Sequence, residues 1–214
     1  MDDEQLMAAY ARGNSSAFHM LYRRHEVALY RFVRRLLGRD LAAHADEVFQ
    51  DTWLRVVKSR ERWAPQGATF RTWLFTLAHH RAIDVLRRSG RERSLDAGSD
   101  DGEREPWQPA DDAQAWRDWP GAPSSSATGA PGSTEDQVFW RAAGQRLLDC
   151  LDTLPAVQRS AFLLHHEDGL AVDDLARALE VGFETAKSRL RYAMSKLRTC
   201  MGAYLPAATL TEPR

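Results

Sequence analysis

The sequence predicts an all-α protein of two small helical domains joined by a flexible acidic linker, and three observations support this fold class. Apolar side chains recur at the spacing of a helix face, for example Phe18, Leu21 and Val33. No alternating apolar and polar pattern is long enough to predict a strand. Residues 94–135 combine an acidic run with a stretch of Gly, Ala, Pro and Ser that has no apolar periodicity, so they cannot bury a core.

Composition divides the chain into parts of different charge. Residues 1–93 contain 17 basic and 11 acidic residues, residues 94–135 contain 2 and 9, and residues 136–214 contain 10 of each. These different balances indicate a different partner for each part. We therefore predict a first domain at 1–93, a linker at 94–135, a second domain at 136–202 and a short tail at 203–214.

Three helices are predicted in the first domain. The first contains the apolar series that starts at Phe18, with Asn14 or Ser15 as its cap and Gly38 at its end. The second runs from Leu41 or Ala45 to Ser59, and the third from Thr69 to Arg88. Proline and glycine within residues 62–67 predict a loop between the second and third helices.

The second domain is also expected to be helical. Its predicted helices are Gln137–Leu151, a helix opened by Pro155, a short helix that includes Leu175 and Leu179, and a last helix from Glu184 to Met201. Proline suits the first turn of a helix. Asp168 and Gly169 are expected to break the chain between the second and third of these helices.

The last two helices have the outline of a helix-turn-helix, with a tight turn at Val181-Gly182. Ala176 is small where the two helices cross. Basic residues populate the last helix, with no acid between Thr185 and Arg198; they are Lys187, Arg189, Arg191, Lys196 and Arg198. Such a helix can enter a major groove, with its first residues at base edges and its flanks on phosphates. The alternative is a solvated basic face on an ordinary helical hairpin.

Several classes of protein are excluded by composition. With 43% hydrophobic and 28% charged residues among 214, the chain is expected to be a soluble globular protein. The acidic start, Met1 to Glu4, does not resemble a secretory or mitochondrial leader, so a cytoplasmic protein is expected. Cys150 and Cys200 form no CxxC motif, and neither a disulfide nor a zinc site is expected. No catalytic constellation or cofactor motif is present in the sequence, so we expect neither an enzyme nor a cofactor.

The second domain contains the residues LPAVQR at 154–159, Gly169-Leu170, Leu175-Ala176 and ETAKSRL at 184–190. In these residues it resembles region 4 of the extracytoplasmic-function (ECF) sigma factors of the sigma-70 family, which recognises the −35 promoter element. It implies that base contacts fall on Lys187, Ser188, Arg191 and Tyr192, and phosphate contacts on Thr185 and Arg189.

The first domain resembles region 2 of the same family, which docks on core RNA polymerase and binds the −10 element. The motifs are DEVFQDTWLRV at 46–56, FRTWLF at 70–75 and AIDVLRR at 82–88. Residues implied in core polymerase binding are Asp46, Gln50, Asp51, Trp53, Leu54 and Arg55. Residues implied in −10 binding and strand opening are Trp63, Arg71, Phe75, His79, His80, Arg81, Arg87 and Arg88. Trp73 and Leu74 are expected in the core, and for Leu54 core and contact are equally favoured.

The resemblance implies a DNA-binding specificity subunit that brings polymerase to −35/−10 promoters and promotes strand opening for transcription initiation. Its partners would be core RNA polymerase (the clamp helices of the largest subunit and the flap of the second-largest), promoter DNA, and an anti-sigma factor that holds it inactive until a stress signal. The linker, with Trp107, Trp116 and Trp119, would thread the polymerase active-site cleft and be ordered only when bound.

Two other hypotheses remain open at this point. The first is a stand-alone helix-turn-helix regulator that binds an operator as a dimer. Core polymerase binding separates it from a sigma factor. The second is a nucleic-acid enzyme that uses the histidine pairs His79-His80 and His165-His166. Neighbours on a helix point about 100° apart and seldom share a metal, so a metal-dependent activity would be needed to support it.

Overall fold

The computed structural model describes residues 1–64, 68–90 and 134–202, and within these ranges the chain is helical with no strand. The helices of the first half are α1 (Asp3–Ala11), α2 (Ser15–Leu37), the 3-10 segment η1 (Arg39–His44), α3 (Ala45–Ser59) and α4 (Phe70–Arg88). Those of the second half are α6 (Thr134–Thr153), α7 (Ala156–Phe162), the π segment η3 (Leu163–Glu167), α8 (Val172–Ala178) and α9 (Phe183–Met201). The all-α, two-part prediction is confirmed, whereas most of the predicted linker and the tail lie outside the described residues.

Local sequence signals account for most helix ends in the first half. The Asn14 side chain accepts a hydrogen bond from the Ala17 N–H at 3.3 Å, and α2 ends at Gly38 with φ +73°. The Thr69 hydroxyl accepts from the Thr72 N–H at 3.1 Å and starts α4. Each cap satisfies backbone groups that a helix terminus leaves free. α1, which the sequence analysis did not predict, starts at a capping box of Asp2 and Gln5.

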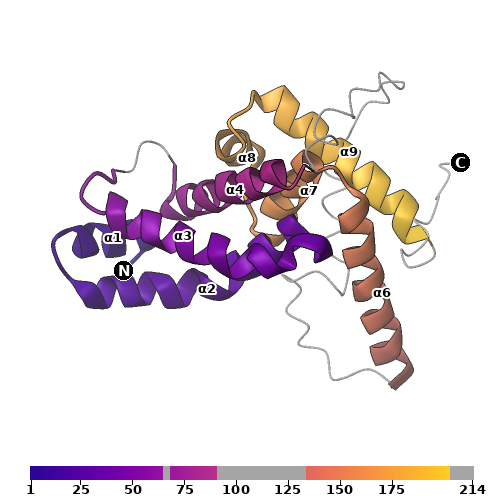
Figure 1. Cartoon of the computed structure of the whole chain (residues 1–214), viewed down its shortest axis with the longest axis horizontal. Helices are drawn as coiled ribbons and strands as arrows, with labels where there is room; N and C mark the ends of the chain where they lie inside the picture. Colours follow the sequence, from indigo (N-terminus) through magenta and orange to yellow (C-terminus); the bar gives the residue numbers. More distant parts are fainter. Residues whose placement is uncertain (65–67, 91–133, 203–214) are drawn as a thin grey trace, which may run out of the picture.

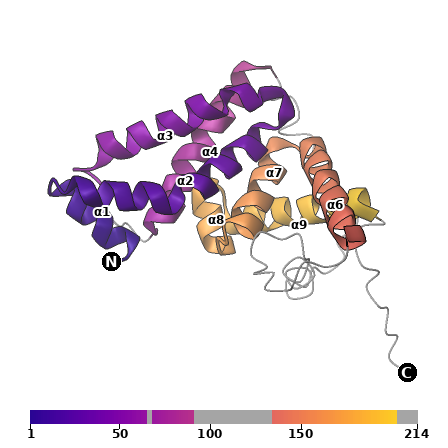
Figure 2. The same ribbon diagram turned by 90° about the horizontal axis from the view of Figure 1, so that it is seen from below.

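In the first half, α2, α3 and α4 pack on one another, and α1 crosses the end of α2 (Figures 1 and 2). Phe32, Phe70 and Phe75 are fully buried between these helices, and Phe32 and Phe75 meet edge to face. Leu74 is also buried, as predicted. Burying a large aromatic ring contributes roughly 1.5–3 kcal/mol, so these rings hold α2 against α4.

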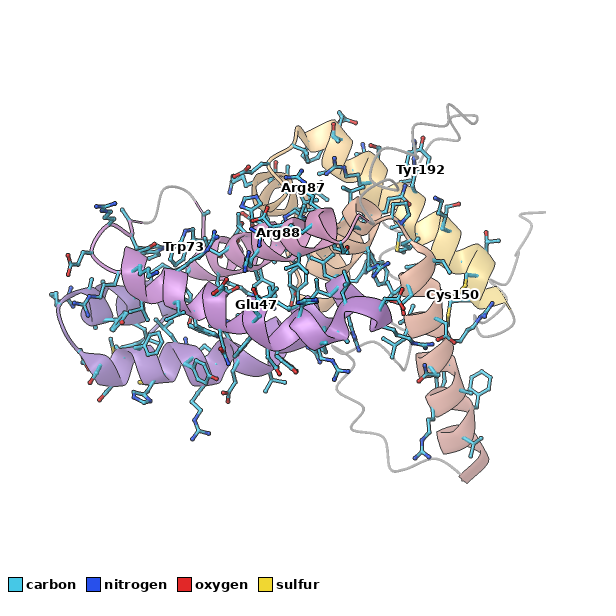
Figure 3. All side chains as sticks on the ribbon, in the orientation of Figure 1. Glu47, Trp73, Arg87, Arg88, Cys150 and Tyr192 are labelled. Carbon is cyan, nitrogen blue, oxygen red and sulfur yellow. A yellow bond between two sulfur atoms is a disulfide. The ribbon has the colours of Figure 1, made fainter. Side chains whose placement is uncertain are left out.

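In the second half, α9 packs against α6, α7 and α8 (Figure 1). Cys150 on α6 and Cys200 on α9 form a disulfide, drawn as a yellow bond in Figure 3. The expectation that these cysteines would stay unpaired was therefore wrong. Spacing in the sequence gave no signal, because the fold brings together two residues 50 positions apart. Arg146 on α6 reinforces this junction by donating two hydrogen bonds to the Cys200 carbonyl.

The two halves pack against each other, a question that the sequence left open. α4 lies beside α8, and α2 contacts α6, α7 and η3 (Figures 1 and 2). Their buried apolar side chains form one continuous core cluster. The arrangement of the halves therefore decides which faces of α4 are open to a partner.

Candidate nucleic-acid interface

The helix-turn-helix predicted from the sequence is formed by α8 and α9. Ala176 is buried where the helices cross, and its carbonyl accepts a hydrogen bond from the Val181 N–H at 3.0 Å. Ala186 and Leu190 are buried on the inner side of α9. The turn contains one backbone feature that the sequence did not predict, a left-handed conformation at Glu180 with φ +51°. A left-handed conformation is costly for a residue with a Cβ atom.

The outer side of α9 carries the residues implied in −35 binding, which we name the −35 face: Thr185, Lys187, Ser188, Arg189, Arg191 and Tyr192. Thr185 is exposed and the others are half-buried. The Ser188 hydroxyl donates to the Thr185 carbonyl at 3.0 Å, and the Arg191 guanidinium lies 5.1 Å from the centre of the Tyr192 ring. The structure thus brings these predicted residues together on the surface of the second helix of the motif, where base edges can be reached.

Phe183 is a candidate that the sequence analysis missed. It is the first residue of α9 and is 44% exposed, next to the exposed Gly182 and Glu184. A large apolar side chain in this position can contact a thymine methyl group in the major groove. The signal was available in the sequence as an aromatic residue directly after the turn glycine, but the helix was expected to begin one residue later.

Region 2 residues implied in −10 binding lie along α4 and the loop before it. We use the name −10 face for six of these residues. Five of them are at least partly exposed and one, His79, is buried; the six are Trp63, Arg71, His79, His80, Arg87 and Arg88. Arg87 and Arg88 are exposed at the end of α4 and are labelled in Figure 3. Trp63 is half-buried against Phe70 and Trp73, with ring centres 6.2 and 6.3 Å away.

Two residues implied in −10 binding occupy other roles. Phe75 is fully buried against Phe32, so the expectation that it stacks on bases is corrected. Arg81 is buried and its guanidinium pairs with Glu47 at 2.8 Å and Asp51 at 2.7 Å. Arg81 therefore neutralises two carboxylates of α3 and is not directed at a phosphate.

The histidine pair on α4 faces the second half of the molecule. His79 is only 7% exposed, and neither ring nitrogen has a hydrogen-bond partner among the described residues. Burial, together with the positive charges of His80, Arg189 and Arg87, lowers the pKa of His79 from 6.5 to about 3. His80 Nε2 lies 3.6 Å from a carboxylate oxygen of Glu180, in the turn of the helix-turn-helix. His79 is thus buried, whereas the His80 side chain remains 35% exposed beside Glu180.

The residues implied in polymerase docking lie on α3. Asp46, Gln50, Leu54 and Arg55 are exposed, and Leu54 at 52% is not a core residue. Asp51 is half-buried because it pairs with Arg81. The remaining member, Trp53, is buried and lies in an aromatic cluster with Phe18, Tyr22 and Phe49. For Trp53 the docking role is corrected to a core role.

Other kinds of site find no support in the part of the chain that the structure describes. No three His, Cys, Asp or Glu side chains there are grouped to hold a metal ion. No helix within the same ranges has the length and apolar character needed to span a membrane.

Comparisons with known proteins agree with this geometry. Residues 21–92 match the family model of Sigma-70 region 2, and residues 144–197 match that of Sigma-70, region 4. The chain is 30% identical over 205 residues to the ECF RNA polymerase sigma factor SigK of Mycobacterium sp. (strain KMS), with 94% of this chain and 91% of SigK covered. SigK of Mycolicibacterium vanbaalenii is 30% identical over 203 residues, with 93% and 89% covered.

Solved structures share the fold. CnrH in complex with the cytosolic domain of CnrY superposes with a TM-score of 0.58 at 20% identity, covering 94% of this chain and 99% of CnrH. The sigma factor RpoE of Bartonella quintana, in complex with the anti-sigma factor NepR, gives a TM-score of 0.56 at 21% identity, with 86% and 96% covered. The two matched regions and the SigK relatives together identify the chain as a member of the ECF sigma factors of the sigma-70 family.

Proposed function

We propose that the chain is an alternative sigma factor that binds core RNA polymerase, directs it to −35/−10 promoters and promotes strand opening for transcription initiation. The observation that carries the proposal is the basic outer face of α9, set in a helix-turn-helix and joined in one chain to a region 2 domain. Family membership argues against a stand-alone regulator. This role requires no bond-making chemistry from the chain, so we do not assign it an enzymatic activity, and it places the protein with polymerase in the cytoplasm.

Roles of single residues belong to the same proposal. On the −35 face, Lys187, Ser188, Arg191 and Tyr192 would read bases while Thr185 and Arg189 hold phosphates, and we add Phe183 as a contact to a thymine methyl group. On the −10 face, Arg87 and Arg88 are exposed cations that would hold the backbone, and Trp63 supplies an aromatic surface for an unstacked base. Free energy for strand opening would come from these captures, without ATP.

Docking on polymerase is proposed for the exposed part of α3, which presents Asp46, Gln50, Leu54 and Arg55. A mixed surface with one exposed apolar residue and flanking charges suits a protein interface. As domain boundaries we propose 1–93 and 136–202, joined by a linker at 94–135 and followed by a tail at 203–214. We also propose that an anti-sigma factor restrains the chain, because the neighbours CnrH and RpoE were each solved with a bound protein.

The proposal is tested by multi-round transcription with core polymerase on a promoter library, with sequencing of the transcripts. Starts downstream of a shared −35/−10 pair that require the protein support it. A protein that neither binds core polymerase nor directs any start contradicts it. Lys187→Gln should change the preferred −35 bases, whereas Lys196→Gln, an exposed lysine further along the same helix, should leave them unchanged.

A further inference from the structure

The acidic start of the chain contacts the helix that carries most of the −10 face. The Glu4 carboxylate, on α1, accepts a hydrogen bond from the Phe70 N–H at 2.9 Å. Phe70 is the first residue of α4 and lies 66 positions away along the sequence. The first N–H groups of a helix have no partner within the helix, and the helix dipole favours a negative charge beside them. Glu4 therefore stabilises the start of α4 from a distant part of the chain.

A second acidic residue of α1 fixes this helix in place. The Asp3 carboxylate pairs with Arg24 on α2 and lies 2.6 Å from His25 Nε2. The Asp3 side chain is 16% exposed, and His25 is buried. Leu6 and Met7, on the next turn of α1, are fully buried. α1 is thus anchored on α2, and the contact that it makes with α4 has a fixed position.

α1 also contacts the other end of the loop that joins α3 to α4. The Arg60 guanidinium, directly after the last residue of α3, lies 5.7 Å from the centre of the Tyr10 ring on α1. A cation near the face of an aromatic ring is attracted to it. One short helix therefore contacts both ends of the loop, at the end of α3 through Tyr10 and at the start of α4 through Glu4.

Trp63 lies between these two ends. Its backbone N–H donates to the Ser59 carbonyl at 2.9 Å, and its ring centre lies 6.2 Å from that of Phe70 and 6.3 Å from that of Trp73. The Phe70 and Trp73 rings are 5.8 Å apart, and Trp73 is labelled in Figure 3. The first turn of α4 is therefore the surface on which the half-buried Trp63 ring rests, and a shift of that turn would move the ring.

We infer that Glu4 is a positioning residue for recognition of the −10 element. Together with Tyr10 it fixes the two ends of the α3–α4 loop and so sets where Trp63 presents its ring to an unstacked base. The inference rests on the proposed function, in which Trp63 supplies that aromatic surface. Stacking on a base depends on the geometry of the ring, and a ring held in place before binding loses less freedom when the base arrives. α1 thus contributes to promoter specificity through another residue.

The first measurement follows the Trp63 ring in the free, full-length protein. Fluorotryptophan replaces all seven tryptophans, fluorine NMR gives a resonance for each, and Trp63→Phe assigns that of Trp63. Glu4→Ala should shift or broaden the Trp63 resonance. Glu4→Gln should restore it, because the amide oxygen can still accept a hydrogen bond from the Phe70 N–H. Asp2→Asn is the matched control, since it removes a negative charge from the same end of α1 and keeps a side chain that can cap the helix; it should leave the Trp63 resonance unchanged.

The second measurement determines base preference, by sequencing transcripts made with core polymerase from a promoter library. Trp63→Ala identifies the −10 position that Trp63 reads. At that position Glu4→Ala should reduce the preference for the favoured base by about fivefold, because a small displacement of a positioned group weakens an interaction that depends on geometry. Glu4→Gln should recover the preference, and the −35 preference should not change in either variant. A loss of stability alone would lower the yield of transcripts without changing the ratio between bases at one position.

Trp53, buried in the aromatic cluster of region 2, reports whether this region stays folded. If Glu4→Ala also moves the Trp53 resonance, Arg60→Ala takes its place in both measurements. The Arg60 side chain is 42% exposed, so its removal leaves the core of region 2 intact and releases the other end of the loop from Tyr10. We expect Arg60→Ala to shift the Trp63 resonance as well, with the Trp53 resonance unchanged.

Two results would overturn the inference. One is a Trp63 resonance that is the same in the wild type and in the folded variant, and the other is a shifted Trp63 resonance with unchanged −10 base preference. Failure of the proposed function looks different. In that case the Trp63 resonance responds to Glu4→Ala and recovers in Glu4→Gln, but the wild-type protein directs no transcript.

Discussion

The −35 face on α9 and the −10 face on α4 carry similar chemistry, basic residues beside aromatic ones, but they differ in what covers them. Thr185 is exposed and Lys187 and Arg191 lie at the surface, whereas His79 is buried on α4, the helix that packs against α8. Arg87 and Arg88 at the end of α4 remain exposed. One DNA-binding face is thus open in the free chain while the other is partly closed by the domain that carries the first.

The largest expected difference between the two halves is in their dependence on the disulfide. Cys150 and Cys200 close a loop of 50 residues in region 4, and the described part of region 2 has no such bond. Removing a native disulfide typically costs about 2–5 kcal/mol. Replacing both cysteines with serine should lower the free energy of unfolding of region 4 by about that amount and leave region 2 unchanged. Hydrogen exchange resolved by region measures both, and equal loss in the two halves would contradict the assignment.

Arginines of α4 should separate into structural and DNA-binding groups. Arg81 is buried with Glu47 and Asp51, so Arg81→Ala should destabilise region 2 by about 2 kcal/mol, less than a fully buried pair because both carboxylates are partly exposed. Arg88→Ala should change stability by less than about 0.5 kcal/mol and weaken −10 binding. Denaturant unfolding and open-complex formation are the two measurements. If the Arg81→Ala protein is as stable as the wild type but opens promoters less well, then Arg81 contacts −10 DNA and its assignment as a structural residue is wrong.

Acid should weaken the contact between α4 and the second half of the molecule. His79 has a pKa of about 3 in the closed protein against an ordinary value of 6.5, so only the open form takes up a proton between these values. The contact is therefore fully stable above pH 6.5 and weakens by about tenfold for each pH unit below it. Arg87, His80 and Arg189 face His79 and favour its neutral form.

The pH effect is measured as the fraction of closed protein, by energy transfer between labels on the two regions, at pH 7.5 and 5.5. Wild type should lose about tenfold in its closed-to-open ratio at pH 5.5. His79→Gln, which cannot take up a proton, should show a much smaller change. An equal pH response in the two proteins would show that protonation of His79 does not cause the change.

The smallest expected effect tests the open face. Phe183→Ala should reduce the preference for thymine at one −35 position by about fivefold, which corresponds to roughly 1 kcal/mol. Phe139→Ala is the matched control, since Phe139 is 43% exposed on α6 of the same region. Sequencing of transcripts from a promoter library gives both values. Unchanged base preference in Phe183→Ala would mean that its ring faces solvent or polymerase in the initiation complex.

Much of the fold was predictable because it is encoded locally. Apolar periodicity placed α2 and α4 to within a residue or two, and for α2 the cap Asn14 and the end at Gly38 were also predicted. The helix-turn-helix was predicted from the turn glycine and the basic run that follows it. The left-handed Glu180 was not, since its conformation follows from the packing of α8 on α9 and not from its own preference.

Contacts between distant segments could not be predicted in the same way. Phe75, Arg81 and Trp53 have side chains suited to binding bases, phosphates or polymerase, yet the structure buries all three in region 2. The type of a side chain indicates what that residue can bind. Whether the side chain is buried depends on which other helix packs against it. The Cys150–Cys200 pair and the Arg159 junction likewise join segments that only tertiary packing brings together.

The central claim is that the two regions are packed together in the free chain and separate on polymerase. Single-molecule energy transfer between labels at Met20 on α2 and Ser195 on α9, both exposed, measures this directly. Labels attached through unnatural amino acids leave Cys150 and Cys200 bonded. The account predicts one high-transfer population in the free protein and a low-transfer population after core polymerase is added. A free protein that already shows the low-transfer state, or one whose transfer does not change with polymerase, would contradict it.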